Sequence, residues 1–131
     1  MYSIGTRESA HAYAVGSNEA YETIRTLPES HAPQPWRVRR TVEGTYVLTY
    51  CEKPAASISD AAVALVLQDE QSTEWIITAY GEKDLYIIQD RETQRVWHAL
   101  DRGMKDIISL AYIDTRRPPP RALFEFRRVN F

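Results

Sequence analysis

Cysteine is nearly absent from this chain of 131 residues, in which Cys51 is the only one. A single thiol cannot form an internal disulfide, a Cys-x-x-Cys redox pair or a multi-thiolate zinc or iron–sulfur site. Long apolar runs are absent as well, because the longest, Ala61–Leu67, is far shorter than the ~20 residues of a transmembrane helix. The composition therefore favours a globular chain that folds without a metal or a membrane.

An excess of charge of either sign is also lacking. The chain has 16 Lys and Arg against 18 Asp and Glu, a net charge of −2, so neither nucleic acid nor an anionic membrane is favoured as its main partner. No signal peptide is visible, since Arg7, Glu8 and His11 interrupt any apolar stretch near the N-terminus. We expect a monomer that stays in the cytoplasm; secretion after removal of a signal is the alternative.

Catalytic motifs are missing. A hydrolase needs a nucleophile, a base and an orienting acid, and none of His11, His31 and His98 lies near a Gly-x-Ser-x-Gly elbow. No two of these histidines have the i, i+4 spacing of helical metal ligands, and the five glycines are scattered singly rather than in a phosphate-binding loop. We therefore expect no enzymatic activity, no cofactor and no metal site.

Strand-like segments recur about every ten residues, whereas no long stretch has the apolar spacing of an amphipathic helix. Glycines and prolines fall between the segments and mark turns. This pattern predicts an all-β barrel or sandwich. The twelve predicted strands are Tyr2–Ile4, His11–Val15, Tyr21–Leu27, Trp36–Val38, Tyr46–Tyr50, Ala56–Ile58, Ala62–Leu67, Glu74–Thr78, Leu85–Gln89, Arg95–Ala99, Ile107–Ile113 and Leu123–Val129.

Aromatic residues repeat through these segments with a period near one third of the chain. In two series, each aromatic residue is followed two positions later by an apolar one. The first series is Tyr2, Tyr46 and Tyr86, and the second is Trp36, Trp75 and Phe124. A four-stranded unit cannot bury its apolar face alone, but three units around an axis share one core and pair their edges. We therefore predict a single domain, residues 1–131, with repeats near 1–40, 41–79 and 80–131.

Side chains two positions apart lie on the same face of a strand, so the aromatic and apolar members of each triplet point inward together. Trp75, which repeats Trp36, is expected to be fully buried. The predicted core consists of Trp36, Val38, Tyr46, Leu48, Leu65, Trp75, Ile77, Tyr86, Ile88, Ile108, Leu110, Phe124 and Phe126.

The arrangement resembles a β-trefoil, with twelve short strands in three pseudo-symmetric four-stranded repeats. The segments Glu74-Trp75-Ile76-Ile77, Leu85-Tyr86-Ile87-Ile88 and Pro118-Pro119-Pro120-Arg121-Ala122-Leu123-Phe124-Glu125-Phe126, with Trp97 between them, resemble the C-terminal half of fungal β-trefoil protease inhibitors. These are the cospin-like serine-protease inhibitors, related in fold to the mycocypins that block cysteine proteases. The resemblance covers residues 36–129 and, loosely, 1–35. It implies a peptidase inhibitor that inserts a rigid surface loop into the active-site cleft of a serine protease or an asparaginyl endopeptidase.

The same resemblance implies a position for the reactive loop. In cospin-like inhibitors this loop lies between the second and third strands of the first repeat, which here corresponds to Gly16, Ser17, Asn18 and Glu19. Gly and Asn tolerate positive φ and suit a projecting turn, so an ordinary hairpin tip is the alternative interpretation.

The residue types in this loop bear on the target. Members that block trypsin present a basic residue there, and Asn18 cannot supply the positive charge that a trypsin pocket attracts. Asn18 suits an asparaginyl endopeptidase instead. If trypsin is inhibited, the candidates become Arg7 in the preceding loop, or Arg116 and Arg117, whose backbone Pro118–Pro120 would stiffen.

A carbohydrate-binding, lectin-like β-trefoil is the alternative function, with a glycan as partner. Ricin-type lectins carry Gln-x-Trp in each repeat, and Gln34-Pro35-Trp36 matches this motif once while the other two repeats lack the Gln. Such sites also need an upstream Asp, and the first 59 residues contain none. In the third repeat, Asp84, Asp90 and Trp97 could supply carboxylates and a stacking ring.

Overall fold

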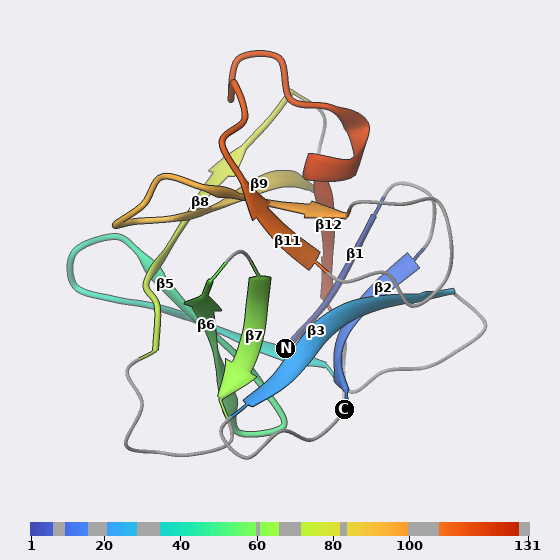
Figure 1. The fold of residues 1–131 in the computed structure, drawn as a ribbon, viewed down its shortest axis with the longest axis vertical. Helices are drawn as coiled ribbons and strands as arrows, with labels where there is room; N and C mark the ends of the chain where they lie inside the picture. Colours follow the sequence, from blue (N-terminus) through green and yellow to red (C-terminus); the bar gives the residue numbers. More distant parts are fainter. Residues whose placement is uncertain are drawn as a thin grey trace.

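The computed structural model describes residues 1–6, 10–15, 21–28, 35–59, 61–65, 72–81, 84–99 and 108–128. They form an all-β fold with one short 3-10 helix, which confirms the predicted class (Figure 1). None of the helical residues described here is part of a segment long and apolar enough to span a membrane. The strands are β1 (Tyr2–Thr6), β2 (Ala10–Val15), β3 (Tyr21–Pro28), β4 (Trp36–Arg40), β5 (Tyr46–Tyr50), β6 (Lys53–Ile58), β7 (Ala61–Leu65), β8 (Trp75–Ala79), β9 (Leu85–Asp90), β10 (Val96–Ala99), β11 (Ile108–Ala111) and β12 (Phe124–Arg128), with η1 (Pro120–Ala122) before the last strand.

Each strand overlaps a predicted segment, because β-branched and aromatic residues between turn residues are a strong strand signal. The bounds differ by up to three residues. β6 begins at Lys53 rather than Ala56, and β11 ends at Ala111 rather than Ile113. The second difference moves Tyr112 and Ile113 from the predicted strand into the connection that follows it.

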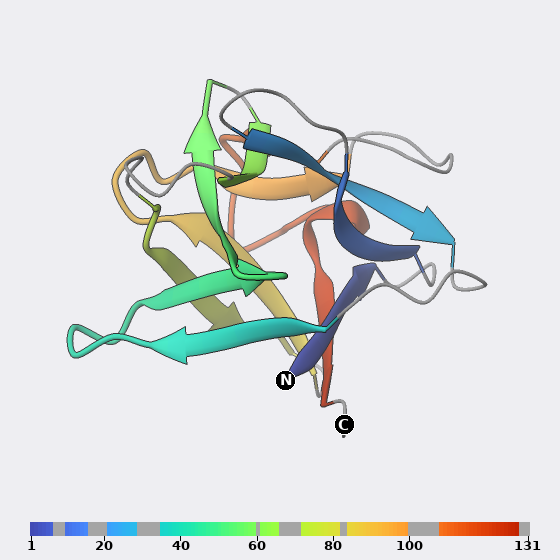
Figure 2. The same cartoon turned by 90° about the horizontal axis from the view of Figure 1, so that it is seen from below.

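Six of the strands close a barrel. β1 pairs with β12, β12 with β9, β9 with β8, β8 with β5, β5 with β4, and β4 returns to β1, always antiparallel. Closure removes the edges of an open sheet. The hairpins β2–β3, β6–β7 and β10–β11 are linked through β3–β7 and β7–β11 and lie together at one end of this barrel (Figure 2).

The pairing scheme recurs at every fourth strand. The pairs β1–β4, β5–β8 and β9–β12 are joined at the same cross-strand contact: Tyr2 opposite Trp36, Tyr46 opposite Trp75, and Tyr86 opposite Phe124. The two aromatic series of the sequence are therefore the two sides of one cross-strand pair that occurs three times around the barrel.

Trp97 of β10 lies in the middle of the core. Its ring centroid is 6.0 Å from that of Trp36, 5.6 Å from that of Trp75 and 5.8 Å from that of Phe124, with edge-to-face interplanar angles of 66°, 86° and 90°. All four side chains are fully buried, at 0% exposure. Each edge-to-face pair is worth ~0.5–1.5 kcal/mol beyond the burial of its area. The second aromatic series therefore converges on a single tryptophan.

Most of the predicted core is confirmed. Val38, Ile77 and Tyr86 are only partly buried but pack against the core, and Tyr46 is half-buried. The side chain of Leu65 lies outside what the structure describes. The prediction missed the core residues Ile4, Ile24, Tyr50, Ala55, Ala62, Trp97 and Ala99. The confirmed buried residues are Trp36, Leu48, Trp75, Ile88, Ile108, Leu110, Phe124 and Phe126.

A second apolar cluster lies outside the main core and fixes the connection between β11 and β12. Its buried members are Leu85, Ile87, Val96, Ala122 and Leu123, with Tyr80 and Ile113 packed against them. Both ends of the connection are thus held, one by Ile113 and the other by η1.

Candidate functional site

The predicted first-repeat loop, Gly16, Ser17, Asn18 and Glu19, lies outside the described residues, and so does Arg7. The strands that flank this loop are described. β2 and β3 pair antiparallel from Ala10 opposite Pro28 to Val15 opposite Thr23, so the predicted residues do connect the two strands of one hairpin. Their role as a reactive loop stays a prediction.

Arg116 and Arg117 lie in a tight turn of the β11–β12 connection. The backbone N–H of Arg117 donates to the carbonyl oxygen of Asp114 at 3.1 Å, and that of Arg116 donates to Oδ1 of Asp114 at 3.0 Å. The Arg116 guanidinium reaches both oxygens of the same carboxylate, at 3.2 and 3.4 Å. The hydrogen bonds that Arg116 donates to this carboxylate, first the one from its backbone N–H and then those from its guanidinium, lower the pKa of Asp114. To enter a trypsin pocket, Arg116 would have to exchange this carboxylate for that of the enzyme.

Tyr112, which begins the same connection, is 78% exposed. The sequence interpretation missed it, because continued alternation after Ile108 and Leu110 would turn Tyr112 inward. The strand ends at Ala111 instead, and Ile113 packs against the second apolar cluster. The signal available in the sequence was Asp114, since Asp favours turns and marks the end of a strand.

The β4–β5 hairpin ends in a turn with a fully exposed apolar tip, Val42, at 106% exposure. The N–H of Thr41 donates to the Thr45 carbonyl oxygen at 2.8 Å, and the N–H of Gly44 donates to the Thr41 carbonyl oxygen at 3.2 Å. Gly44 has φ +85°, a value that favours glycine. The hydroxyls of Thr41 and Thr45 are 2.7 Å apart, and Thr45 donates to Oε1 of Glu74 at 2.5 Å.

Arg91 extends this polar network by pairing with Glu43 and, at 3.2 Å, with Glu74. The hydrogen bond to Glu43 is the main reason why the pKa of Arg91 is raised. These pairs are exposed, so each is worth only ~0–1 kcal/mol. Together they connect the hairpin turn to β8 and to the turn after β9.

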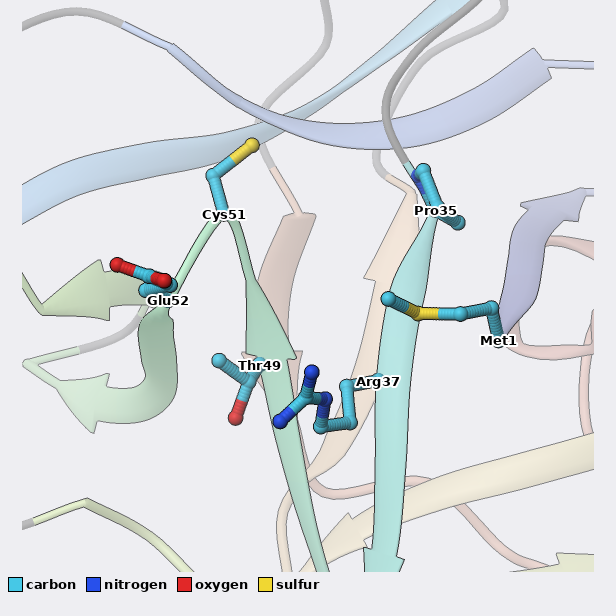
Figure 3. Close-up of a pocket in the computed structure, with 6 residues that line it drawn as sticks. All are labelled: Met1, Pro35, Arg37, Thr49, Cys51 and Glu52. Carbon is cyan, nitrogen blue, oxygen red and sulfur yellow. The ribbon is translucent and has the colours of Figure 1, made fainter. Parts of the chain in front are cut away.

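A pocket of about 250 Å³ lies between the start of β4 and the β5–β6 turn (Figure 3). Cys51 and Glu52 form the turn with φ of 50° and 67°, as a two-residue hairpin of type I′ requires. The Cys51 thiol points away from Arg37 and Thr49. The lining residues include no histidine that could activate this thiol, and no metal-binding group of His, Cys, Asp and Glu occurs among the residues described. The lining is formed by Met1, Pro35, Arg37, Thr49, Cys51 and Glu52.

The geometry rules out two of the three residues considered for a sugar site in the third repeat, Trp97 and Asp90, whereas Asp84 is exposed. Trp97 has 0% exposure and cannot stack on a ligand. Asp90 is 3% exposed, and its Oδ1 accepts hydrogen bonds from the backbone N–H groups of Glu92 at 2.9 Å and Thr93 at 3.4 Å. Trp36, the tryptophan of the single Gln-x-Trp motif, is buried too. These residues therefore serve the core and a turn, not a binding site.

A family model for peptidase inhibitor I66 matches residues 2–128. The chain belongs to this family. It is therefore a peptidase inhibitor and not an enzyme, as the sequence resemblance implied, and its partner is a peptidase.

Solved structures share the fold over almost the whole chain. A proteinase inhibitor from Coprinopsis cinerea is 20% identical, with a TM-score of 0.82 and coverage of 98% of this chain and 96% of that one. The designed 3-fold symmetric protein ThreeFoil is 13% identical, with a TM-score of 0.80 and 98% coverage of both chains. SeviL, solved with asialo-GM1 saccharide, is 13% identical, with a TM-score of 0.75 and coverage of 98% and 97%. At these identities the likeness shows the fold alone. A sequence search among curated proteins gives no match.

Proposed function

We propose that this chain inhibits a serine peptidase by holding a surface loop in the active-site cleft, where the loop backbone lies as a substrate would. Membership of the peptidase inhibitor family over residues 2–128 carries the proposal. A loop that the barrel already holds in shape loses little conformational freedom on binding, which favours tight association. An asparaginyl endopeptidase is the alternative target.

The scaffold of this proposal is a β-trefoil of twelve strands, with repeats near residues 1–40, 41–79 and 80–131. Strand pairing that recurs at every fourth strand supports it, as does the likeness to a designed 3-fold symmetric protein. In such a scaffold the inward-facing residues form the core, and the connections between strands can vary in sequence and carry the binding function.

Two sets of residues are candidates for the inhibitory loop. The first is Gly16, Ser17, Asn18 and Glu19, for which Asn18 would suit an asparaginyl endopeptidase. The second is formed by basic residues that would suit a trypsin-like pocket: Arg7, Arg116 and Arg117.

Titration against trypsin, chymotrypsin, subtilisin, papain and asparaginyl endopeptidase tests the proposal. We expect tight inhibition of at least one of these enzymes by a monomer that binds with 1:1 stoichiometry. The variants Asn18→Ala, Arg7→Ala and Arg116→Ala then test the candidate loops: a loss of inhibition confined to one variant, at the parent melting temperature, would identify its loop, and unchanged inhibition by all three would exclude both candidate sets. No inhibition of any enzyme in the panel would refute the proposed function.

A further inference from the structure

Three large apolar side chains are exposed among the residues described: Val42, Tyr112 and Met1, at 106%, 78% and 48%. Tyr is one of the types enriched at the energetic centres of protein interfaces, because it offers a large contact area with few rotatable bonds. Tyr112 takes no part in either apolar cluster. Its side chain is therefore available to a partner without any loss of packing inside the protein.

The backbone around Tyr112 is fixed on both sides. Leu110, two residues before it, is 5% exposed in the main core, and Ile113, directly after it, packs against the second apolar cluster. Further along, Ala122 in η1 is fully buried, and Arg121 donates to the Ala99 carbonyl oxygen at 3.2 Å. The aromatic side chain is thus presented from a pre-organised segment, which reduces the ordering cost of binding.

The other prominent side chains on described connections fit a peptidase cleft less well. A cleft that receives peptide in extended form cannot take up a tight turn without rearranging it. Val42 lies inside the turn that Gly44 and Thr41 close, and Arg116 lies inside the turn that Arg117 and Asp114 close. Tyr112 lies before that second turn, directly after β11.

Chymotrypsin-type peptidases have a hydrophobic slot as their primary specificity pocket, whereas trypsin has an acidic residue there. The phenol ring of a tyrosine fits the hydrophobic pocket of chymotrypsin, but it has no positive charge to pair with the acidic residue in the trypsin pocket. We infer that Tyr112 determines the specificity of this inhibitor by filling the primary pocket of a chymotrypsin-like serine peptidase. The inference rests on the proposed function and names the target class for it.

The test compares inhibition constants for chymotrypsin and trypsin. Tyr112→Ala should weaken the inhibition of chymotrypsin by at least about 30-fold, the loss that defines an interface hot spot. Tyr112→Phe should keep it, because the slot accepts a phenyl ring. Tyr112→Lys should lose the inhibition of chymotrypsin and gain inhibition of trypsin. Val42→Ala is the matched control: it truncates an apolar side chain that is even more exposed, at 106% against 78%, on a different connection, and should change neither constant.

Two results would overturn the inference and leave the proposed function standing. One is inhibition of another peptidase of the panel without inhibition of chymotrypsin. The other is chymotrypsin inhibition by Tyr112→Ala within about threefold of the parent, far below a hot-spot loss. If the parent protein inhibits no enzyme of the panel, both the proposed function and this inference are refuted. Melting temperatures equal to the parent value establish that each variant is folded.

Discussion

Replacing Trp97 with Ala tests the central packing of this protein most directly. Trp97 is fully buried, and its ring makes edge-to-face contacts with Trp36, Trp75 and Phe124. These three partners come from β4, β8 and β12, so they cannot close over the space without shifts in three barrel strands at once. The cavity left by the substitution should therefore remain largely open.

The size of the effect follows from two contributions. Burying a Trp side chain removes ~150–250 Å² from water, which at ~25 cal/mol per Å² is ~4–6 kcal/mol, an upper bound because unfolded chains bury some of it already. Large-to-small changes of Trp in cores cost ~3–5 kcal/mol. We expect Trp97→Ala to lower the free energy of unfolding by about 4–5 kcal/mol, a large part of the ~5–15 kcal/mol that a domain has.

Urea denaturation followed by circular dichroism measures this loss, with Tyr112→Ala as the control that should stay within about 0.5 kcal/mol of the parent. Trp97→Phe is the second control. No described residue accepts a hydrogen bond from Nε1 of Trp97, so Phe should keep much of the ring packing without the buried N–H and cost clearly less than Ala. A loss below 1 kcal/mol for Trp97→Ala would refute the central position of this ring.

Three smaller effects should follow from the same structure. Asp90→Ala should cost about 1–2 kcal/mol in urea denaturation, because the N–H groups of Glu92 and Thr93 lose a carboxylate acceptor; an unchanged midpoint would contradict this. Gly44→Ala should cost about 1–2 kcal/mol through its φ of +85° alone, since the nearest atom to an added Cβ is at 3.9 Å; a melting temperature equal to the parent's would be evidence against strain. Burial and, to a smaller extent, the charge of Arg121 lower the pKa of His98, so the folded state binds a proton less readily than the unfolded state. The free energy of unfolding should therefore fall as pH drops through the ordinary value of 6.5, and His98→Gln should flatten this dependence between pH 7.5 and 5. Parallel curves of unfolding free energy against pH for parent and variant would exclude His98 as its source.

The barrel core could be predicted from the sequence because its physics is periodic. Inward positions of a closed sheet alternate along each strand, and symmetric packing asks for the same kind of residue three times. Trp36, Trp75 and Phe124 satisfy both conditions, and all three are fully buried. Tyr50 was missed because it faces inward in its strand but has no counterpart in the aromatic series; Ile4 was left out of the predicted core although it follows Tyr2 as Leu48 follows Tyr46.

The loops could not be predicted in the same way. Tyr112 is exposed because β11 ends one residue before it, and a strand end depends on where the partner strand and the next turn allow pairing to stop. Arg116 was considered for its charge and for the stiff prolines that follow it, whereas in the structure Asp114 pairs with its guanidinium. Local hydrogen bonding of this kind leaves no periodic trace in a sequence.

Trp97 shows where a periodic argument must fail. The pairing of Gly5 with His11, of Thr49 with Pro54 and of Gln89 with Val96 places the next residues along β2, β6 and β10, namely Ala12, Ala55 and Trp97, at matching positions.

Matching positions around an axis point toward the same space, and three indole rings cannot occupy it together because interiors are already close-packed. One large side chain fills it instead: Trp97 packs against Trp36, Trp75 and Phe124, and the small Ala55 at the matching position of β6 is fully buried. A residue that breaks the repeat is therefore expected at the point where the repeats converge, and Trp97 is the residue against which Trp36, Trp75 and Phe124 all pack.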